Sequence, residues 1–458
     1  MSFSYRKSKV LRRSRVMRWS WRLWKPRIVF WIGALAIGLV SVAFALAADE
    51  AEVFFHAVTA SGSHGYLWPL LLTPTGFILC SFLTMRYFPN AQGSGIPQAI
   101  AARHLKHSHL RAPLLSLKIA FGKIVLTVIG LCCGASIGRE GPTVQVGAAI
   151  MVASGRIGGM AQAQGLILAG SAAGIAAAFN TPLAGIVFAI EEMSRTFQSR
   201  ANGLVLTAVI LSGLSALGIV GSYTYFGEVA VTALEGRDWL MVVLCGVLGG
   251  ALGAGFSKGA LSASRRIRVW AHPDPTKRML MLAGGCGLLV ALIGVLSGGE
   301  TFGTGYEQSR QIMAGELVSP TFFLEKLATT FISMMSGIPG GIFAPSLSVG
   351  VGLGGTLGWL LGTSLALSAI LGMAGYFSGV VQAPMTAFVI IIEMTGSHEA
   401  VIPVMAASMI GYVTSRLIAP EPLYHGLSRA FIAQAIRQQR NEGRGGGEDE
   451  AANNSSPR

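Results

Sequence analysis

Residues 131–150 read LCCGASIGREGPTVQVGAAI, and in this stretch two charged side chains, Arg139 and Glu140, stand between glycines in an otherwise apolar run. Pro142 follows closely, and proline is favoured at the first position of a helix, where its missing N–H is not needed. The residues TVQVGAAIM can continue that helix. The stretch therefore predicts a helix that begins inside an apolar region, with a carboxylate beside its start.

The composition of the whole chain indicates an integral membrane protein. Of 458 residues, 52% are hydrophobic and 12% are charged, and the mean hydropathy is +0.57. Soluble domains average about 25% charged residues. We therefore predict an all-α polytopic membrane protein, with apolar spans at 28–48, 66–85, 114–137, 167–190, 204–220, 239–256, 279–296, 322–335, 347–373, 380–392 and 401–418. Several spans are short or contain Gly and Pro, and broken helices occur in membranes where they are buried in protein or line a cavity.

The net charge of +14 is concentrated at one end of the chain. Residues 1–27 contain ten Lys and Arg and no acidic residue. Positive segments that flank a first span stay in the cytoplasm, and they favour contact with anionic lipid over nucleic acid. We predict a multi-pass protein of the cell (inner) membrane with both termini in the cytoplasm, and a polar, Gly-rich and disordered tail over 433–458.

The cysteines and histidines show no recognisable pattern of a metal site. The five cysteines lie in apolar stretches without the paired spacing of metal ligands, and the eight histidines form no cluster in the sequence. We predict neither a metal nor a cofactor.

The chain repeats itself. One set of residues recurs at a constant offset of 203: Lys123, Gly134, Gly138, Pro142, Val146 and Gly147 match Lys326, Gly337, Gly341, Pro345, Val349 and Gly350. A second block, from Ala169, aligns with one from Leu371 at an offset of 202. A two-fold repeat within a membrane chain is common in transporters, with the functional site at the repeat interface. We predict a transmembrane domain over 28–432, with halves over 28–220 and 236–418.

Three Gly-flanked helix starts could form an anion site. These are GSGIP at Gly93, GREGP at Gly138 and GGIFAP at Gly340. Free backbone N–H groups and the positive end of a helix dipole attract anions, and the hydroxyl of Ser94 can donate a hydrogen bond. The alternative is that these turns only break helices between packed spans.

Glu140 can act as a tethered anion. Its carboxylate could occupy the ring of N–H groups, block a mobile anion, and leave when it is protonated. Proton and anion would then compete for one place. The structural alternative is a buried ion pair with Arg139 that only fixes the loop.

Glu191 and Glu192 lie about ten residues past a helix start at Pro182, which is about 15 Å along a helix. That distance brings them near the cytoplasmic surface, where one of them could pass protons inward. The alternative is a pair of solvated acids at a helix end.

The motifs together resemble the CLC family of chloride channels and chloride/proton antiporters. GSGIP, GREGP, AFNTPLAGIVFAIEE at Ala178, GIPGGIFAP at Gly337 and PLY at Pro422 stand in the order of that family. The resemblance implies a CLC-type inverted repeat of tilted and partial membrane helices. It also implies a homodimer in which each subunit has its own pore.

The resemblance implies roles for individual residues. Glu140 matches the external gate and Glu192 the internal proton-transfer residue. Ser94 and Tyr424 match the side chains that bind the central chloride, although Tyr424 could also be an interfacial anchor. The residues whose backbone amides line the path are matched by Ile342, Phe343, Ala344, Glu140 and Gly141, and the supporting residues are Arg139, Lys123, Gly95 and Pro97. Gln98 departs from the family, in which many members have Glu.

The resemblance therefore implies a secondary transporter that exchanges chloride for protons, with Ser94 favouring chloride over nitrate or fluoride. A passive voltage- or proton-gated chloride channel of the same fold is the alternative, in which Glu192 would be idle. A membrane hydrolase is a third possibility, because Ser136 in GASIG fits the pattern G-x-S-x-G. That pattern lacks the strand and the histidine partner that such an enzyme needs.

Overall fold

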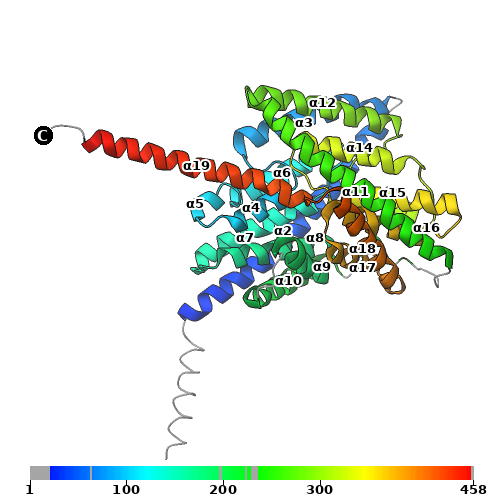
Figure 1. The fold of residues 1–458 in the computed structure, drawn as a ribbon, viewed down its shortest axis with the longest axis horizontal. Coiled ribbons are helices and arrows are strands. Elements are labelled where there is room, and N and C mark those ends of the chain that lie inside the picture. The colour runs from blue at the N-terminus through cyan, green and yellow to red at the C-terminus, as the bar shows by residue number, and fades with distance from the viewer. Residues whose placement is uncertain are drawn as a thin grey trace, which may run out of the picture.

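The computed structural model describes residues 21–61, 64–194, 199–221, 224–227, 229 and 236–454. Most of the predicted basic segment 1–27 lies outside these ranges. The described residues form a bundle of α-helices without β-strands, apart from two isolated bridges at Gly93 and Gly138 (Figure 1).

The first half of the chain contains α2 to α10. Their bounds are α2 Trp21–Ala60, α3 Pro69–Tyr87, α4 Ile96–His104, α5 Ser108–Arg111, α6 Leu117–Cys132, α7 Glu140–Gly158, α8 Ala163–Phe179, α9 Pro182–Phe188 and α10 Ser199–Val220. A π-helical turn, Ala189–Ser194, follows α9.

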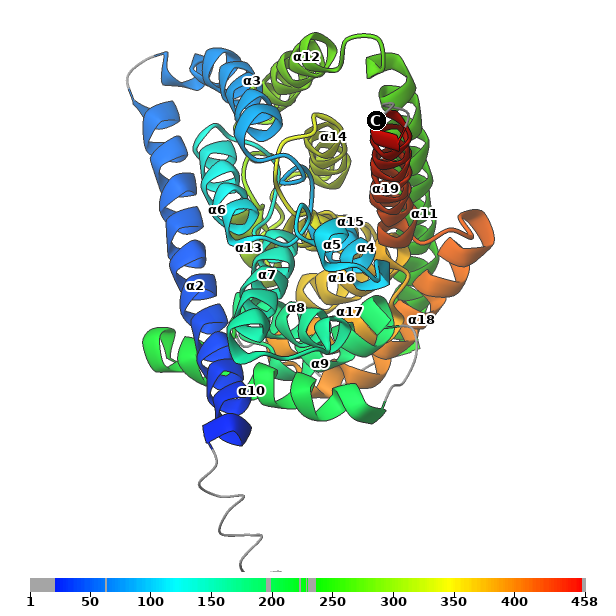
Figure 2. The same cartoon turned by 90° about the vertical axis from the view of Figure 1, so that its left-hand side faces the viewer.

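The second half contains α11 to α18 and is followed by α19. Their bounds are α11 Gly236–Ala271, α12 Pro275–Leu296, α13 Tyr306–Met313, α14 Phe322–Met335, α15 Phe343–Leu361, α16 Leu365–Val381, α17 Pro384–Thr395, α18 Val401–Ile418 and α19 Leu423–Asn454. Figure 2 shows the long helices α2 and α11 on opposite sides of the bundle, with shorter helices between them.

Seven helices are long and apolar enough to cross a membrane, and α8, α16 and α17 are shorter apolar helices. The multi-pass prediction is therefore confirmed. Two predicted spans are divided in the structure, and the helix start predicted at Pro182 is the first residue of α9. Span 167–190 is divided into α8 and α9 where Asn180 takes a left-handed conformation (φ 55°), and span 347–373 is divided into α15 and α16 at Gly362 (φ 64°).

The repeat is present in the backbone geometry. Equivalent positions of the two halves adopt the same left-handed conformation: φ is 79° at Gly134 and Gly337, 71° and 64° at Gly159 and Gly362, and 55° and 57° at Asn180 and Gln382. L-residues rarely take this conformation. Its recurrence at matched non-glycine positions indicates that both halves end their helices in the same way.

Glycines let the central helices of each half approach closely. A Cβ atom at Gly174 of α8 would lie 2.5 Å from the carbonyl oxygen of Thr143 in α7. In the second half, a Cβ atom at Gly350 of α15 would lie 2.6 Å from the Cα atom of Met373 in α16. Small residues at helix contacts are the usual solution in membranes.

Two glutamates join the halves by capping each other's helices. The carboxylate of Glu393, in α17, accepts hydrogen bonds from the amides of Leu183 (3.1 Å) and Ala184 (2.7 Å) at the start of α9. The carboxylate of Glu191 accepts from the amides of Met385 (3.1 Å) and Thr386 (2.6 Å) at the start of α17. Glu191 is therefore a helix cap, and the alternative of a solvated acid is wrong for it.

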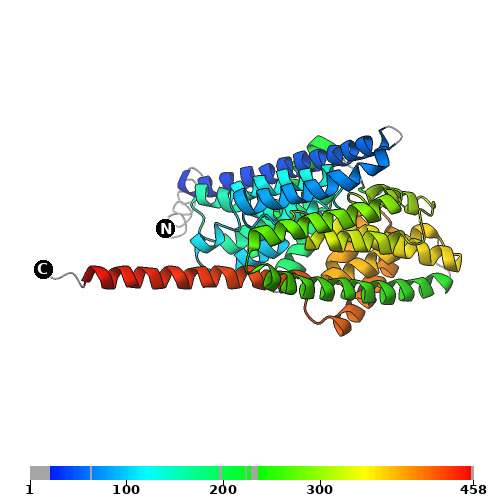
Figure 3. The same cartoon turned by 90° about the horizontal axis from the view of Figure 1, so that it is seen from above.

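The predicted disordered tail over 433–458 differs from the structure, because α19 continues as helix to Asn454. Residues 430–440 read AFIAQAIRQQR, and Ala, Gln and Arg are strong helix formers. A helix already begun at Leu423 therefore extends easily through them. Figure 3 shows α19 projecting away from the bundle.

We predict that Glu393→Gln lowers the free energy of unfolding by about 1–3 kcal/mol, because hydrogen bonds to a charged acceptor are lost at the start of α9. The measurement is the thermal unfolding midpoint of the purified protein in detergent. Glu399→Gln is the matched control, since Glu399 is exposed on the segment after α17. Equal midpoints for the two variants would contradict the capping role.

Candidate functional site

Three extended segments cross at the centre of the bundle. The amide of Gly93 donates to the carbonyl of Ile338 (3.0 Å), and the amide of Gly340 donates back to Gly93 (3.1 Å). Gly138 and Gly341 exchange two hydrogen bonds of 2.7 Å each. These segments lead directly into α4, α7 and α15, so the three helix starts quoted from the sequence converge.

The helix starts differ in detail from the prediction. α7 begins at Glu140 and α15 at Phe343, so Pro142 and Pro345 occupy the third helical position, not the first. The first four amides of a helix have no partner within it, and proline is tolerated at any of them for that reason. The amides of residues 140, 141, 343 and 344 therefore lie in the first turns of α7 and α15, where they have no hydrogen-bond partner within the helix. Pro97 is the second residue of α4, after Gly95 (φ 99°).

Buried oxygen atoms gather around these helix starts. The hydroxyls of Ser94 and Tyr424 and both carboxylate oxygens of Glu140 are buried and make no well-formed hydrogen bond in the described part of the chain. The amides of Glu140 and Ala344 interact electrostatically with the Glu140 carboxylate. Buried polar groups are normally paired. The Glu140 carboxylate therefore already lies against amides at these helix starts, as a bound anion would.

Contacts among these residues place them in one site. A Cβ atom at Gly141 would clash with the hydroxyl oxygen of Ser94, and one at Gly138 would clash with the Glu140 carboxylate. Tyr424, in the first turn of α19, has its ring centroid 5.9 Å from that of Phe343. Ile342 is the buried N-cap residue of α15.

Lys123 and Gln98 support the segment that carries Ser94. The ammonium of Lys123 donates to the carbonyls of Gly93 (2.7 Å) and Gln92 (3.4 Å). The side-chain amide of Gln98 donates to Gln92 (2.6 Å) and Asn90 (3.2 Å). Many family members have Glu at this position, and an ionised glutamate cannot donate a hydrogen bond. Gln98 therefore makes two hydrogen bonds to backbone carbonyls that a charged glutamate side chain could not make.

Arg139 is directed towards α2. Its guanidinium donates to the Asp49 carboxylate and to the Ala45 carbonyl, at 2.5 Å each. Arg139 therefore forms an ion pair with Asp49, and it also acts electrostatically on the Glu140 carboxylate. Asp49 was missed in the sequence because it lies 90 residues earlier, in a different helix.

Glu192 is buried, unlike the solvated acid considered as an alternative at this helix end. Its side chain is fully buried, and its carboxylate is 3.8 Å from Nε2 of His425, the residue after Tyr424. The alternative of a solvated acid is therefore wrong for Glu192 as well. Both Glu192 and Glu140 act electrostatically on the Tyr424 hydroxyl.

Ser136 has a structural environment. Its hydroxyl shares a 3.0 Å hydrogen bond with that of Thr330, and its amide donates to Ser333 (3.3 Å). Among the described residues, no histidine forms a hydrogen bond with Ser136. The arrangement gives no support to a hydrolase.

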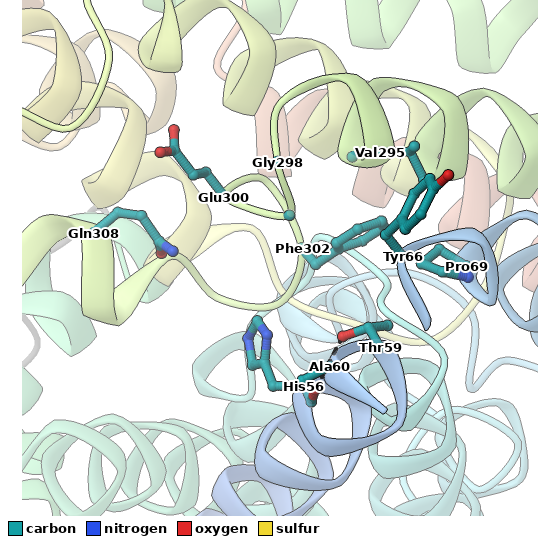
Figure 4. Close-up of a pocket in the computed structure, with 12 residues that line it drawn as sticks. His56, Thr59, Ala60, Tyr66, Pro69, Val295, Gly298, Glu300, Phe302 and Gln308 are labelled. Carbon is teal, nitrogen blue, oxygen red and sulfur yellow. Dashed lines mark hydrogen bonds between the residues drawn. The ribbon is translucent and has the colours of Figure 1, made fainter. Parts of the chain in front are cut away.

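A separate cavity of about 400 Å³ lies between the end of α2 and the loop after α12. Figure 4 shows His56 and Thr59 facing the loop that carries Glu300 and Phe302. Burial, and then the neighbouring Glu325, raise the pKa of the Glu300 carboxyl. Phe302 packs edge-on against Phe55 (4.8 Å), and none of the predicted site residues lines this cavity.

Broken helices from two structural repeats that meet around buried hydroxyls and a carboxylate define a class of membrane transport protein. The sequence model of the family described as voltage gated chloride channel matches residues 76–416, and the chain belongs to this CLC family.

Named relatives support the assignment to this family. The H(+)/Cl(-) exchange transporter ClcA of Salmonella arizonae is 30% identical over 440 residues, covering 89% of each chain. That of Salmonella schwarzengrund is 28% identical over 466 residues, covering 93% of this chain and 94% of the relative.

Solved structures confirm the predicted CLC-type fold. A slow cyanobacterial Cl-/H+ antiporter superposes with a TM-score of 0.76 at 23% identity, covering 89% of this chain and 98% of the other. A CLC-type fluoride/proton antiporter superposes with a TM-score of 0.73 at 24% identity, covering 88% and 96%.

We predict that Lys123→Met loosens the segment before α4, because the carbonyls of Gln92 and Gly93 lose a charged donor, a change of about 1.5–3 kcal/mol. Hydrogen–deuterium exchange of the peptide that covers residues 90–98 should become faster. Lys118→Met is the matched control, because Lys118 is exposed on the same helix. Unchanged exchange in Lys123→Met would contradict this role.

Proposed function

We propose that this protein exchanges chloride for protons across a membrane through a pore in each subunit. The observation that carries the proposal is the pair of fully buried carboxylates, Glu140 and Glu192, which both interact electrostatically with the buried Tyr424 hydroxyl. The names of the ClcA relatives support it. Buried carboxylates in a membrane are functional candidates by default.

In the proposed site, chloride binds the hydroxyls of Ser94 and Tyr424. Backbone amides at the starts of α7 and α15 complete the site, from Gly141, Ile342, Phe343 and Ala344. Amides and hydroxyls suit a dehydrated anion because they stabilise its charge without placing a full cation there, which would hold the ion too tightly to release it.

Glu140 couples the two ions. When its carboxylate is charged, it competes with chloride for the same amides. When it is protonated, its attraction to those amides falls and chloride takes the place. The protonation state of Glu140 and the occupancy of the amides by chloride are therefore linked at one place, and this links the movements of the two ions.

Glu192 provides the inner proton step. It is buried beside His425 and lies in electrostatic reach of Tyr424, whereas a passive channel needs no buried acid at this position. This observation favours the exchanger over the channel of the same fold.

We further propose the cell (inner) membrane as the location, with both termini in the cytoplasm and residues 28–432 as the transmembrane domain. The first turns of α2 and the projecting α19 lie at the same end of the bundle (Figures 1 and 3). A homodimer through α10 and α17 is the proposed assembly, because both present exposed apolar side chains, among them Leu206, Ile210 and Met385.

We predict uphill proton movement in liposomes that contain the protein under a chloride gradient. Glu140→Ala and Glu192→Ala should each abolish proton movement while chloride still passes, because each removes one proton carrier. Proton flux is measured with a pH electrode and chloride with an ion-selective electrode. Glu307→Gln, on the exposed face of α13, should behave as wild type. Chloride flux without proton coupling in the wild type would indicate the channel, and no chloride flux would exclude both.

We also predict that Tyr424→Phe weakens chloride binding by about 5- to 100-fold, because one hydrogen bond to a charged partner is lost, about 1–3 kcal/mol. Isothermal titration calorimetry of the purified protein measures this. Tyr376→Phe is the matched control, since the Tyr376 hydroxyl in α16 is also buried and unpaired. Equal affinities of the two variants would contradict chloride ligation by Tyr424.

A further inference from the structure

A basic groove lies between the last turns of α11 and the first turns of α19. It consists of two adjoining cavities of about 570 and 830 Å³, both lined by Leu261, Arg265, Glu421 and Arg429. We refer to it as the α11–α19 groove. It is separate from the proposed ion site, none of whose residues lines it.

The charge of the groove is strongly positive. Glu421 is the only carboxylate in the lining, and it forms an ion pair with Arg429 at 2.8 Å. The structure records no ion pair, within its described ranges, for the other five basic residues. The six basic residues of the lining are Lys258, Arg265, Arg268, Arg416, Arg429 and Arg437.

Apolar side chains share the same lining. Val269 is 77% exposed, and Leu261, Leu427 and Ala430 lie beside the arginines. A soluble anion needs only the cations. A lining of guanidinium groups with adjacent apolar surface fits an amphiphile with an anionic head.

The position of the groove along α11 fits the surface of a membrane. α11 has 36 residues and is therefore about 54 Å long, whereas the hydrocarbon core of a bilayer is about 30 Å thick. Its last turns must leave the hydrocarbon. Trp270 is 43% exposed there, with the Arg278 guanidinium 5.5 Å from its ring centroid, and tryptophan is typical of the headgroup level.

We propose that the α11–α19 groove binds the phosphate headgroup of an anionic phospholipid. Guanidinium groups bind phosphate oxygens in a bidentate manner. The lipid would contact both α11 and α19, and thereby brace the helix whose first turn carries Tyr424. Assignment to the cytoplasmic leaflet rests on the proposed orientation, whereas lipid binding does not depend on the transport function.

Native mass spectrometry of the full-length protein in mild detergent tests the proposal. The probes are phosphatidylglycerol, phosphatidylcholine with the same acyl chains, and soluble glycerol phosphate. Wild type should bind phosphatidylglycerol at least tenfold more tightly than phosphatidylcholine. Each arginine near an anionic surface contributes about 1 kcal/mol, or about fivefold. Arg265→Gln and Arg268→Gln should each weaken binding by about that factor, and the double variant by about 25-fold.

Arg266→Gln is the matched control, because Arg266 is exposed on the same turn of α11 but does not line the groove. It should bind phosphatidylglycerol as wild type does. An equal loss in Arg266→Gln would overturn the proposal in favour of diffuse attraction to the surface. Equal affinity for the two phospholipids would also overturn it. Glycerol phosphate binding as tightly as the lipid would identify a site for soluble anions instead. Unfolding midpoints in detergent establish that all variants are folded.

Discussion

The structure depends on how backbone polar groups are satisfied where helices break inside the membrane. Every N–H and C=O group in that environment needs a partner within the protein or a ligand, because lipid offers none. The two 2.7 Å hydrogen bonds between Gly138 and Gly341 meet this need at the centre. The buried ammonium groups of Lys123 and Lys326 meet it for the carbonyls of the flanking segments. Amides at the starts of α7 and α15 have no partner within their own helices and remain available for a ligand or for the Glu140 carboxylate.

The same constraint explains why the supporting features occur twice. Lys326 donates to the carbonyls of Thr301 (2.9 Å) and Gly303 (2.8 Å), as Lys123 does to Gly93. The Glu393 carboxylate caps the start of α9, and the Glu191 carboxylate caps the start of α17. A duplicated chain that breaks its helices at equivalent positions exposes equivalent backbone groups, and equivalent side chains satisfy them. Each half therefore pairs the backbone groups at its helix breaks in the same way.

The local features of the site could be predicted from the sequence, and the long-range ones could not. Gly and Pro act on their own neighbours, so GSGIP and GREGP predicted helix starts to within two residues. The partner of Arg139 is Asp49 and the neighbour of Glu192 is His425, 233 residues away, and no periodicity encodes such pairs. Glu191 and Glu192 could not be told apart because they lie in a π-helical turn, where the facing of side chains departs from the 3.6-residue period. The break at Asn180 uses a residue that is enriched in the left-handed conformation, whereas Gln382 carries no such signal.

The places where the two halves differ are as informative as those where they agree. At the offset of 203, Glu140 corresponds to Phe343, and at the offset of 202, Glu192 corresponds to Met394. The starts of α7 and α15 face each other across the Gly138–Gly341 pair, so a second carboxylate at position 343 would bring two buried negative charges together, which is strongly unfavourable. Phe343 instead packs against Phe377 (4.9 Å) and near Tyr424, and this fixes the start of α15. The two-fold symmetry is therefore broken at the proposed site: one half places a carboxylate at the start of its helix, and the other half places a packed aromatic ring at the equivalent position.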